Sequence, residues 1–155
     1  MNKVNVIVKQ HINFEIYNSV GLSLLNKSLH EIAHLYPNFN AWLNFKFRRN
    51  LSSGERNIIL ATDGSNILGL SLLKKSKDES KICTFYVPEE YRGMNIGRDL
   101  MSKSLSILDS QNSFITVADE RHSELKPLLD SSGFKLIKSV DALYREDSTE
   151  HFYYL

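Results

Sequence analysis

The sequence predicts an α/β fold in which a mixed, mostly antiparallel sheet is flanked by helices. Three observations predict it. β-rich runs gather in the middle and at the end of the chain, helical patterns separate the later runs, and the turn-forming pair Asp63-Gly64 stands between two of the earlier ones. Strands joined by short turns pair antiparallel, whereas strands joined through a helix can pair parallel. A chain of 155 residues suits one core, so residues 1–155 are expected to form a single domain.

The first part of the chain is expected to hold one strand and one or two helices. Val4 to Val8 is rich in Val and Ile and predicts a strand. A helix is expected over Phe14 to Leu35, stopped by Pro37. Phe39 to Phe47 is short and aromatic and could be a second helix or an irregular lid. The apolar positions with helical spacing are Leu22, Leu25, Leu29 and Ile32.

The middle of the chain predicts an antiparallel meander. Asn57 to Thr62 and Ile67 to Leu73 are strand-like runs on either side of Asp63-Gly64, which is a strong hairpin signal. Lys81 to Val87 follows a polar turn and predicts a third strand.

The second half alternates between helices and strands. Ile96 to Leu108 places apolar residues on one helical face, and Leu125 to Ser131 is a short helix that Gly133 can cap. Strands are expected at Phe114 to Val117, Phe134 to Val140 and Phe152 to Leu155.

Composition and charge narrow the function classes. Apolar residues make up 42% and charged residues 24%, which is ordinary for a globular protein, and the net charge is only +1. A dedicated nucleic-acid binder usually has a marked basic excess, so nucleic acid is not the expected partner. Cys83 is the single cysteine, so no internal disulfide can form. With neither a signal-peptide pattern nor a membrane-spanning apolar run, a cytoplasmic protein is expected.

The most informative stretch runs from Cys83 to Leu108, CTFYVPEEYRGMNIGRDLMSKSLSIL. A short apolar run ends at Pro88, a turn with two glycines follows, and a helical pattern then begins. The unpaired N–H groups at a helix start and the positive end of the helix dipole favour an anion. The sequence therefore predicts a phosphate-holding turn between a strand and a helix.

This turn and the order of elements resemble the GNAT superfamily of N-acyltransferases. The family motif is Gln or Arg, two residues, Gly, one residue, then Gly or Ala, and it aligns with Arg92 to Gly97. The family also has a short helix followed by Gly-Phe and a strand, which here is KPLLDSSGFKLI with Gly133-Phe134. The resemblance covers about Asn57 to Lys138.

The resemblance implies a site for an acyl-CoA, with acetyl-CoA as the expected co-substrate. The pyrophosphate of the coenzyme would lie on backbone amides at the helix start, where Gly93 and Gly97 permit close approach and unusual dihedrals. The preceding strand, Cys83 to Val87, would splay from its neighbour and pair its free backbone groups with the pantetheine arm. The implied cofactor-binding residues are Phe85, Tyr86, Val87, Arg92, Gly93, Met94, Asn95, Ile96, Gly97 and Arg98.

Three positions depart from the family pattern. Asn95 stands where the family usually has Gly, although Asn tolerates the left-handed conformation. Leu129 replaces the Tyr that in many members protonates the leaving thiolate, and His122 takes the place often held by Asn. Two hypotheses follow: an N-acyltransferase, and a GNAT-like domain that binds an acyl-CoA or a partner without turnover.

The implied reaction is direct attack of a primary amine on the thioester in a ternary complex. The enzyme must position the thioester, polarise its carbonyl and accept a proton from the amine. The acceptor is expected to be a small molecule or a protein, and the aromatic end from His151 to Leu155 could pair in a homodimer. Candidates for the acid–base role are Glu89, Glu120, His122 and Tyr86, with Tyr144 and a nucleophilic Cys83 as weaker ones.

A separate pattern, His30-Glu31-Ile32-Ala33-His34, fits the H-E-x-x-H motif of zinc peptidases. The longer form of that motif fails, because Pro37 and Asn40 occupy the Gly and third His positions. No metal is therefore expected, and a zinc hydrolase is a third, weaker hypothesis. In GNAT-like folds this region borders the acceptor site, so the resemblance implies that His30, His34 and Trp42 bind the acceptor.

Overall fold

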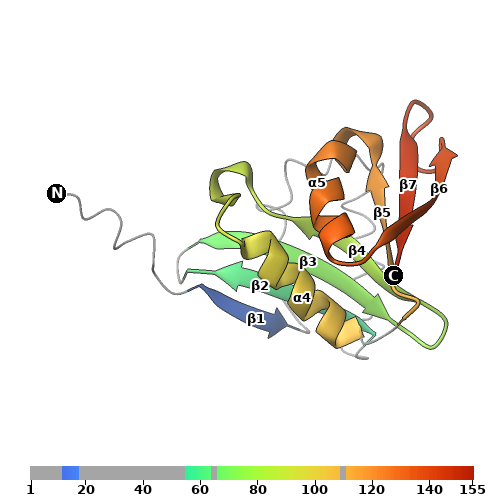
Figure 1. Ribbon diagram of the computed structural model, residues 1–155. Helices are drawn as coiled ribbons and strands as arrows, with labels where there is room; N and C mark the ends of the chain where they lie inside the picture. The colour runs from blue at the N-terminus through green and yellow to red at the C-terminus, as the bar shows by residue number, and fades with distance from the viewer. Residues whose placement is uncertain (1–11, 18–54, 64–65, 109–110) are drawn as a thin grey trace.

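The computed structural model describes residues 12–17, 55–63, 66–108 and 111–155. Within them a seven-stranded sheet has the order β1-β2-β3-β4-β5-β7-β6 (Figure 1). Its strands are β1 Asn13–Tyr17, β2 Arg56–Thr62, β3 Ile67–Lys75, β4 Ser80–Tyr86, β5 Phe114–Ala118, β6 Lys135–Asp141 and β7 Thr149–Tyr154. The helices are η3 Glu89–Tyr91, α4 Ile96–Leu108 and α5 Asp119–Ser131. Only β4 and β5 pair parallel in this sheet, so the predicted mixed, mostly antiparallel fold is confirmed.

The predicted meander is present as β2, β3 and β4. β2 and β3 form the hairpin expected from Asp63-Gly64, and the Asp63 carboxylate accepts the Asn66 backbone N–H at 2.9 Å. Consecutive side chains from Ile58 to Ala61 are buried. Because successive strand residues face opposite sides, both faces of this part of the sheet are covered.

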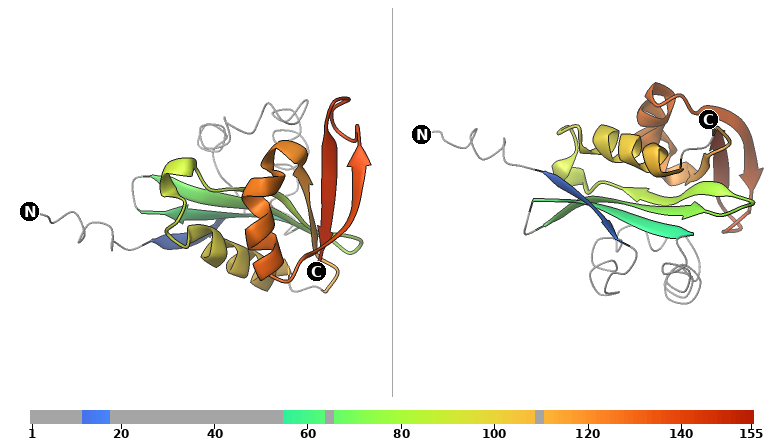
Figure 2. Two further views of the ribbon diagram at one scale, coloured as in Figure 1. Left: turned by 45° about the horizontal axis from the view of Figure 1, so that its top comes forward. Right: turned by 90° about the horizontal axis from the view of Figure 1, so that it is seen from below.

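The helices α4 and α5 lie on the same face of the sheet (Figure 2). α4 has the predicted bounds, and it buries Ile96, Leu100, Met101 and Leu108. No helix in the described ranges is long and apolar enough to cross a membrane.

Two predicted elements differ from the structure. Residues 13–17 form β1 and not the start of a helix, because this segment pairs antiparallel with β2. α5 begins at Asp119, six residues before the expected Leu125, and Asp119 and Glu120 supply the negative charge that favours a helix N-terminus. The predictions for Val4 to Val8, Phe39 to Phe47 and the rest of the first helix lie outside the described residues.

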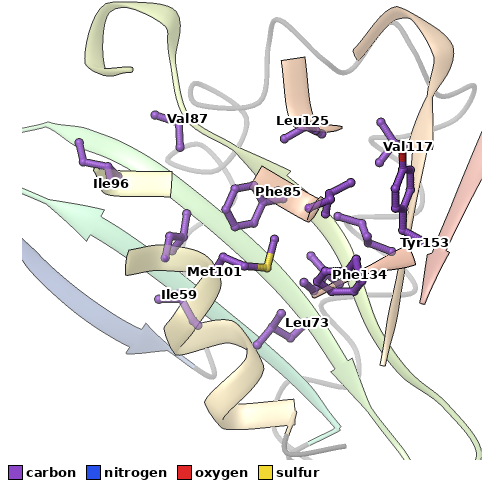
Figure 3. Packing of buried hydrophobic residues seen from close by; sticks show 14 of the residues in the cluster. Ile59, Leu73, Phe85, Val87, Ile96, Met101, Val117, Leu125, Phe134 and Tyr153 are labelled. Carbon is purple, nitrogen blue, oxygen red and sulfur yellow. The ribbon is translucent and has the colours of Figure 1, made fainter. Parts of the chain in front are cut away.

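The core fills the space between the sheet and the two helices. Phe85 and Val87 from β4 and its end, Met101 from α4, Leu125 from α5 and Tyr153 from β7 all belong to it (Figure 3). The core therefore joins β4, α4 and α5, which are the three elements that meet at the predicted turn.

Gly69 on β3 lets the start of α4 approach the sheet closely. A Cβ at this position would lie 3.3 Å from Ile96 Cγ2, from the Tyr86 carbonyl oxygen and from Val87 Cγ2. Such contacts are tighter than ordinary van der Waals packing, so a glycine here sets how near the first turn of α4 comes to β3 and β4.

Candidate functional site

The turn between β4 and α4 takes two left-handed backbone conformations. Gly93 has φ 86° and Asn95 has φ 65°. Asn95 therefore adopts the conformation expected of a residue that replaces glycine here. Its carbonyl accepts the first helical hydrogen bond, from Asp99 N–H at 3.1 Å. Turns of this kind present successive N–H groups toward one side and form anion-binding concavities.

A cavity of about 440 Å³ opens beside this turn. This volume falls within the range of small-molecule sites. Seven of the ten residues predicted to bind the cofactor line it: Phe85, Val87, Arg92, Gly93, Asn95, Gly97 and Arg98. Residues of α5 form the opposite wall: Glu124, Leu125, Pro127, Leu128 and Ser131.

The other three predicted cofactor residues have different positions. Tyr86 is buried beneath Arg121, with the guanidinium carbon 5.6 Å from its ring centre, and Ile96 is part of the core. Met94 is 37% exposed on the turn. Gly97 also differs from expectation, because it is helical within α4 and only Gly93 of the two glycines has a positive φ.

Arg92 connects the turn with α5. Its Nε donates a hydrogen bond to the Val87 carbonyl at 2.8 Å, and its Nη2 lies 3.2 Å from the Glu124 carboxylate. Arg92 and Arg98 bring positive charge to the cavity wall, and Glu124 partly offsets it. The wall can therefore hold an anion that replaces or joins the Glu124 carboxylate.

Arg121 is a site residue that the sequence analysis missed. It is only 7% exposed, and its Nη2 donates to the Phe85 carbonyl at 2.8 Å and to Glu124 at 3.0 Å. In the sequence it belongs to a polar stretch, Asp119 to Glu124, that is typical of a solvated helix start. One signal was present, because Arg121 lies four and eight residues before the apolar Leu125 and Leu129, on the buried stripe of α5.

β4 and β5 separate beside Arg121, as the resemblance implied. They pair only at Lys81 with Phe114 and at Ile82 with Ile115. The expected free backbone is only partly present, because the Phe85 and Val87 carbonyls already accept hydrogen bonds from the two arginines. A ligand arm that uses these carbonyls must displace an arginine side chain.

The acid–base candidates lie outside the walls of the cavities beside the turn and between β4 and β5. Tyr86 is 3% exposed, and Glu89 lies on the exposed turn η3. Glu120 forms an ion pair with Arg145 and accepts a hydrogen bond from Ser148. The hydrogen bond from Arg145 lowers the pKa of Glu120, which makes it a weaker base.

His122 lies between α5 and β7 in a hydrogen-bonded cluster. Its Nε2 is 2.6 Å from the Tyr153 hydroxyl, and its ring stacks on that of His151 with centres 4.0 Å apart. His151 in turn bonds Asp119 at 2.8 Å and Ser139 at 2.7 Å. Burial first, and the neighbouring His151 second, lower the pKa of His122 and favour its neutral form.

Asp119, His122 and His151 offer three metal-ligating atoms within 4.8 Å of one another. The two imidazole rings lie within 22° of parallel. Because imidazole lone pairs lie in the ring plane, they do not converge on one ion in this arrangement. Hydrogen bonding accounts for the cluster better than a metal does.

The remaining sequence candidates are placed as follows. Leu129 is fully buried in the core, and Tyr144 is 42% exposed. Burial raises the pKa of the Cys83 thiol, which disfavours a nucleophilic thiolate. His30, His34 and Trp42 lie outside the described residues.

The comparisons with known proteins identify the family. The profile of the acetyltransferase (GNAT) domain matches residues 26–146, which is more than half of the chain. The chain belongs to the GNAT acetyltransferase family. No curated protein sequence matches it.

Solved structures of the same fold cover nearly the whole chain. NAA60 of Arabidopsis thaliana, in complex with acetyl-CoA, has a TM-score of 0.70 at 15% identity and covers 94% of this chain and 98% of its own. Ard1 of Thermoplasma volcanium has a TM-score of 0.69 at 18% identity, and the match covers 92% of this chain and 96% of Ard1. A GNAT-family acetyltransferase of Bacillus cereus has a TM-score of 0.65 at 17% identity, and the match covers 92% of this chain and 96% of that protein. At these identities the likeness concerns the fold.

Proposed function

We propose that this chain is an acetyl-CoA-dependent N-acetyltransferase, which transfers the acetyl group to a primary amine by direct attack in a ternary complex. The observation that carries the proposal is the cavity at the start of α4, whose wall contains the Arg92–Gly97 turn. Membership of the GNAT family and the acetyl-CoA complex of the NAA60 structure support it.

The residues of the turn suit a pyrophosphate. The N–H groups at the start of α4 and the left-handed Gly93 and Asn95 would hold the phosphate oxygens. Arg92 and Arg98 would add charge-assisted contacts. The pantetheine arm would then extend between β4 and β5, where the two strands separate.

The transfer step needs a neutral amine and a group that takes its proton. Of the four acid–base candidates, His122 is proposed to take this proton through water, because burial and the neighbouring His151 lower its pKa and favour the neutral imidazole. The other three candidates stay predictions with less support. Glu89 is exposed, Glu120 forms an ion pair with Arg145, and Tyr86 is buried.

Calorimetry with acetyl-CoA at millimolar concentration tests the proposal. The chain is expected to bind, and Gly93→Val is expected to abolish binding, because a β-branched residue is strained at φ 86°. Lys126→Gln is the matched control, since Lys126 is exposed on α5 and pairs only with Asp130 in the described part of the chain. Absence of binding to the unaltered chain would refute the proposal.

A second candidate function, binding of acetyl-CoA without turnover, is favoured by Leu129. This residue replaces the usual tyrosine acid and is fully buried. Release of free thiol from acetyl-CoA in the presence of amines, peptides and aminoacyl-tRNA distinguishes the two. Amine-dependent release supports the enzyme, and tight binding with no release across the panel supports the second function.

The acceptor is proposed to be an amine of a small molecule or a protein, since the net charge of +1 disfavours nucleic acid. A cytoplasmic location is proposed from the single cysteine. β7 lies inside the sheet, so a homodimer would form through the edge strand β6, where Leu136 and Ile137 are exposed.

A further inference from the structure

Arg121 lies where β4 and β5 separate. Beyond the paired Ile82 and Ile115 the two strands diverge, and the wedge between them holds a small cavity of about 10 Å³. Its lining comes from both strands and from α5: Cys83, Thr84, Phe85, Ile115, Thr116, Val117, Arg121 and Leu125. A space of this size accommodates about one water-sized group.

Arg121 has a buried N–H without a partner among the described residues. Its Nη2 bonds the Phe85 carbonyl and Glu124, and its guanidinium lies over the Tyr86 ring, but its Nε is buried and makes no hydrogen bond. Leaving a buried donor unsatisfied costs about 1–3 kcal/mol, more when the group is charged. This N–H therefore remains able to donate to a ligand atom.

The small cavity neighbours the cavity beside the turn, since Phe85 and Leu125 line both. From Val87 to Cys83, β4 advances about 13 Å at roughly 3.3 Å per residue. A pantetheine arm that starts from a pyrophosphate at the turn and follows β4 therefore brings its thioester end toward the wedge. Arg121 bonds the Phe85 carbonyl on this path, and its Nη2 contacts the same Glu124 carboxylate oxygen as the Nη2 of Arg92, so the two guanidinium groups lie close together beside the arm.

We propose that Arg121 stabilises the negative charge that develops on the thioester carbonyl oxygen during acetyl transfer. This inference rests on the proposed function. The amine nitrogen forms a bond to the carbonyl carbon, and the electron pair of the C=O double bond moves to oxygen, beside the guanidinium. The C–S bond then breaks as the C=O bond reforms, and the thiolate leaves with its electron pair. The proton lost by the amine passes to water, and the thiolate takes up a proton from water, so the products are an amide and a free thiol.

Arg121 also fits the absence of the usual acid. Leu129 cannot protonate the leaving thiolate, and a guanidinium does not donate its proton at neutral pH. A fixed positive charge on a buried side chain nevertheless stabilises a developing anion strongly. Because it is bound to Phe85 and Glu124, the guanidinium is already oriented before the reaction begins.

Carbon NMR of acetyl-CoA labelled with ¹³C at the carbonyl tests the inference without knowledge of the acceptor. In the complex with the unaltered protein the carbonyl resonance should move downfield from its free position, because a charged donor polarises the bond. Arg121→Gln should lose most of this shift, Arg121→Lys should keep part of it, and Lys126→Gln should keep all of it. With an acceptor found by the thiol assay, Arg121→Gln should lower kcat about 100-fold, with a much smaller change in KM.

The outcomes separate this inference from the proposed function. If the unaltered protein does not bind acetyl-CoA, both fail. If it binds but the carbonyl resonance does not move, or moves equally in Arg121→Gln, only the role of Arg121 is refuted. If Arg121→Gln does not fold, Arg121→Lys replaces it in the test. A smaller carbonyl shift in Arg121→Lys than in the unaltered protein supports the role of Arg121, and an equal shift refutes it.

Discussion

Asn95 shows what one residue can reveal about a turn. Its sequence position, in place of a motif glycine, predicted a left-handed backbone, and φ 65° agrees. Arg121 shows the opposite case. The polar residues beside it are typical of a solvated helix start, and only its helical spacing from Leu125 and Leu129 indicated burial. The Phe85 carbonyl that it bonds lies 36 residues away. Local conformational preference is encoded at the residue itself, whereas a contact between distant residues is known only from packing.

The left-handed backbone of Asn95 should set the effect of substitutions there. Asn95→Ala is expected to lower the free energy of unfolding by about 1 kcal/mol, because Cβ sterics disfavour this conformation and Ala lacks the compensating amide. Asn95→Gly should change it by less than about 0.5 kcal/mol and keep acetyl-CoA binding. Urea unfolding and calorimetry measure both.

Ala142 is the matched comparison, because it has φ 57° without a polar side chain. Ala142→Gly should raise stability by about 1 kcal/mol if left-handed strain dominates. If Asn95→Ala and Asn95→Gly change the free energy of unfolding equally, the left-handed backbone at position 95 does not explain why asparagine stands there.

His122 should make stability depend on pH. Its pKa is lower in the folded chain than the unfolded value of about 6.5, so below that pH the unfolded chain binds more protons. The free energy of unfolding should therefore be highest above pH 6.5 and fall as the pH decreases through the folded pKa. Urea unfolding at pH 7.5 and pH 5.5 measures the difference.

The matched variant is His122→Gln, which keeps a polar group beside the Tyr153 hydroxyl and removes the titration. The decrease between the two pH values should become smaller in this variant. His151→Gln removes the adjacent imidazole, which also lowers the pKa of His122, and should reduce the decrease partly. An unchanged pH dependence in His122→Gln would contradict the assignment.

At the scale of elements, prediction succeeded where the pattern was local. The hairpin β2–β3 and helix α4 follow from a turn signal and a helical repeat that each occupy one short stretch. β1 was wrongly expected to be helical, because the apolar spacing began only at Leu22 and residues 13–17 are fixed by pairing with β2. Strand pairing with a distant partner outweighed the helical extrapolation.

Gly69 and Gly97 should respond to alanine in opposite ways. At Gly69 a Cβ meets three atoms at 3.3 Å, so Gly69→Ala should cost about 1–3 kcal/mol, displace the start of α4 and weaken acetyl-CoA binding. At Gly97 the nearest atom is 3.6 Å away and the residue is helical, so Gly97→Ala should raise stability by up to about 1 kcal/mol.

Thermal unfolding and calorimetry of both variants test this. In Gly97→Ala the added methyl makes only ordinary contacts with Leu128 and Val87 on the cavity wall, and the family motif admits Ala at this position, so acetyl-CoA binding should persist while stability rises. If Gly69→Ala raises stability as Gly97→Ala does, the close approach of α4 to β3 does not depend on Gly69.

At the scale of the molecule, the sheet consists of two parts that share one core but few backbone pairings. β1 to β4 meet β5, β7 and β6 through only two parallel residue pairs at one end of β4. Across the open end, Arg92 of the turn bonds Glu124 of α5, and Arg121 of α5 bonds β4. The two parts are therefore bridged by charged groups where the coenzyme is proposed to lie. The family motif predicted the turn and the cavity, but not this bridge, because Glu124 and Arg121 belong to no motif.

Glu124→Gln should change stability and ligand response in opposite directions. Loss of the carboxylate removes one partner from each of two arginines, so the melting temperature without ligand should fall, by the equivalent of about 1 kcal/mol for partly exposed pairs. The pyrophosphate no longer competes with a carboxylate for Arg92, so acetyl-CoA should bind more tightly and raise the melting temperature by more than in the unaltered protein. Asp130→Asn removes a carboxylate from the exposed pair with Lys126 on the same helix, and it should leave the ligand-induced rise unchanged. A smaller rise in Glu124→Gln than in Asp130→Asn would mean that Glu124 helps to hold the coenzyme and does not compete with it.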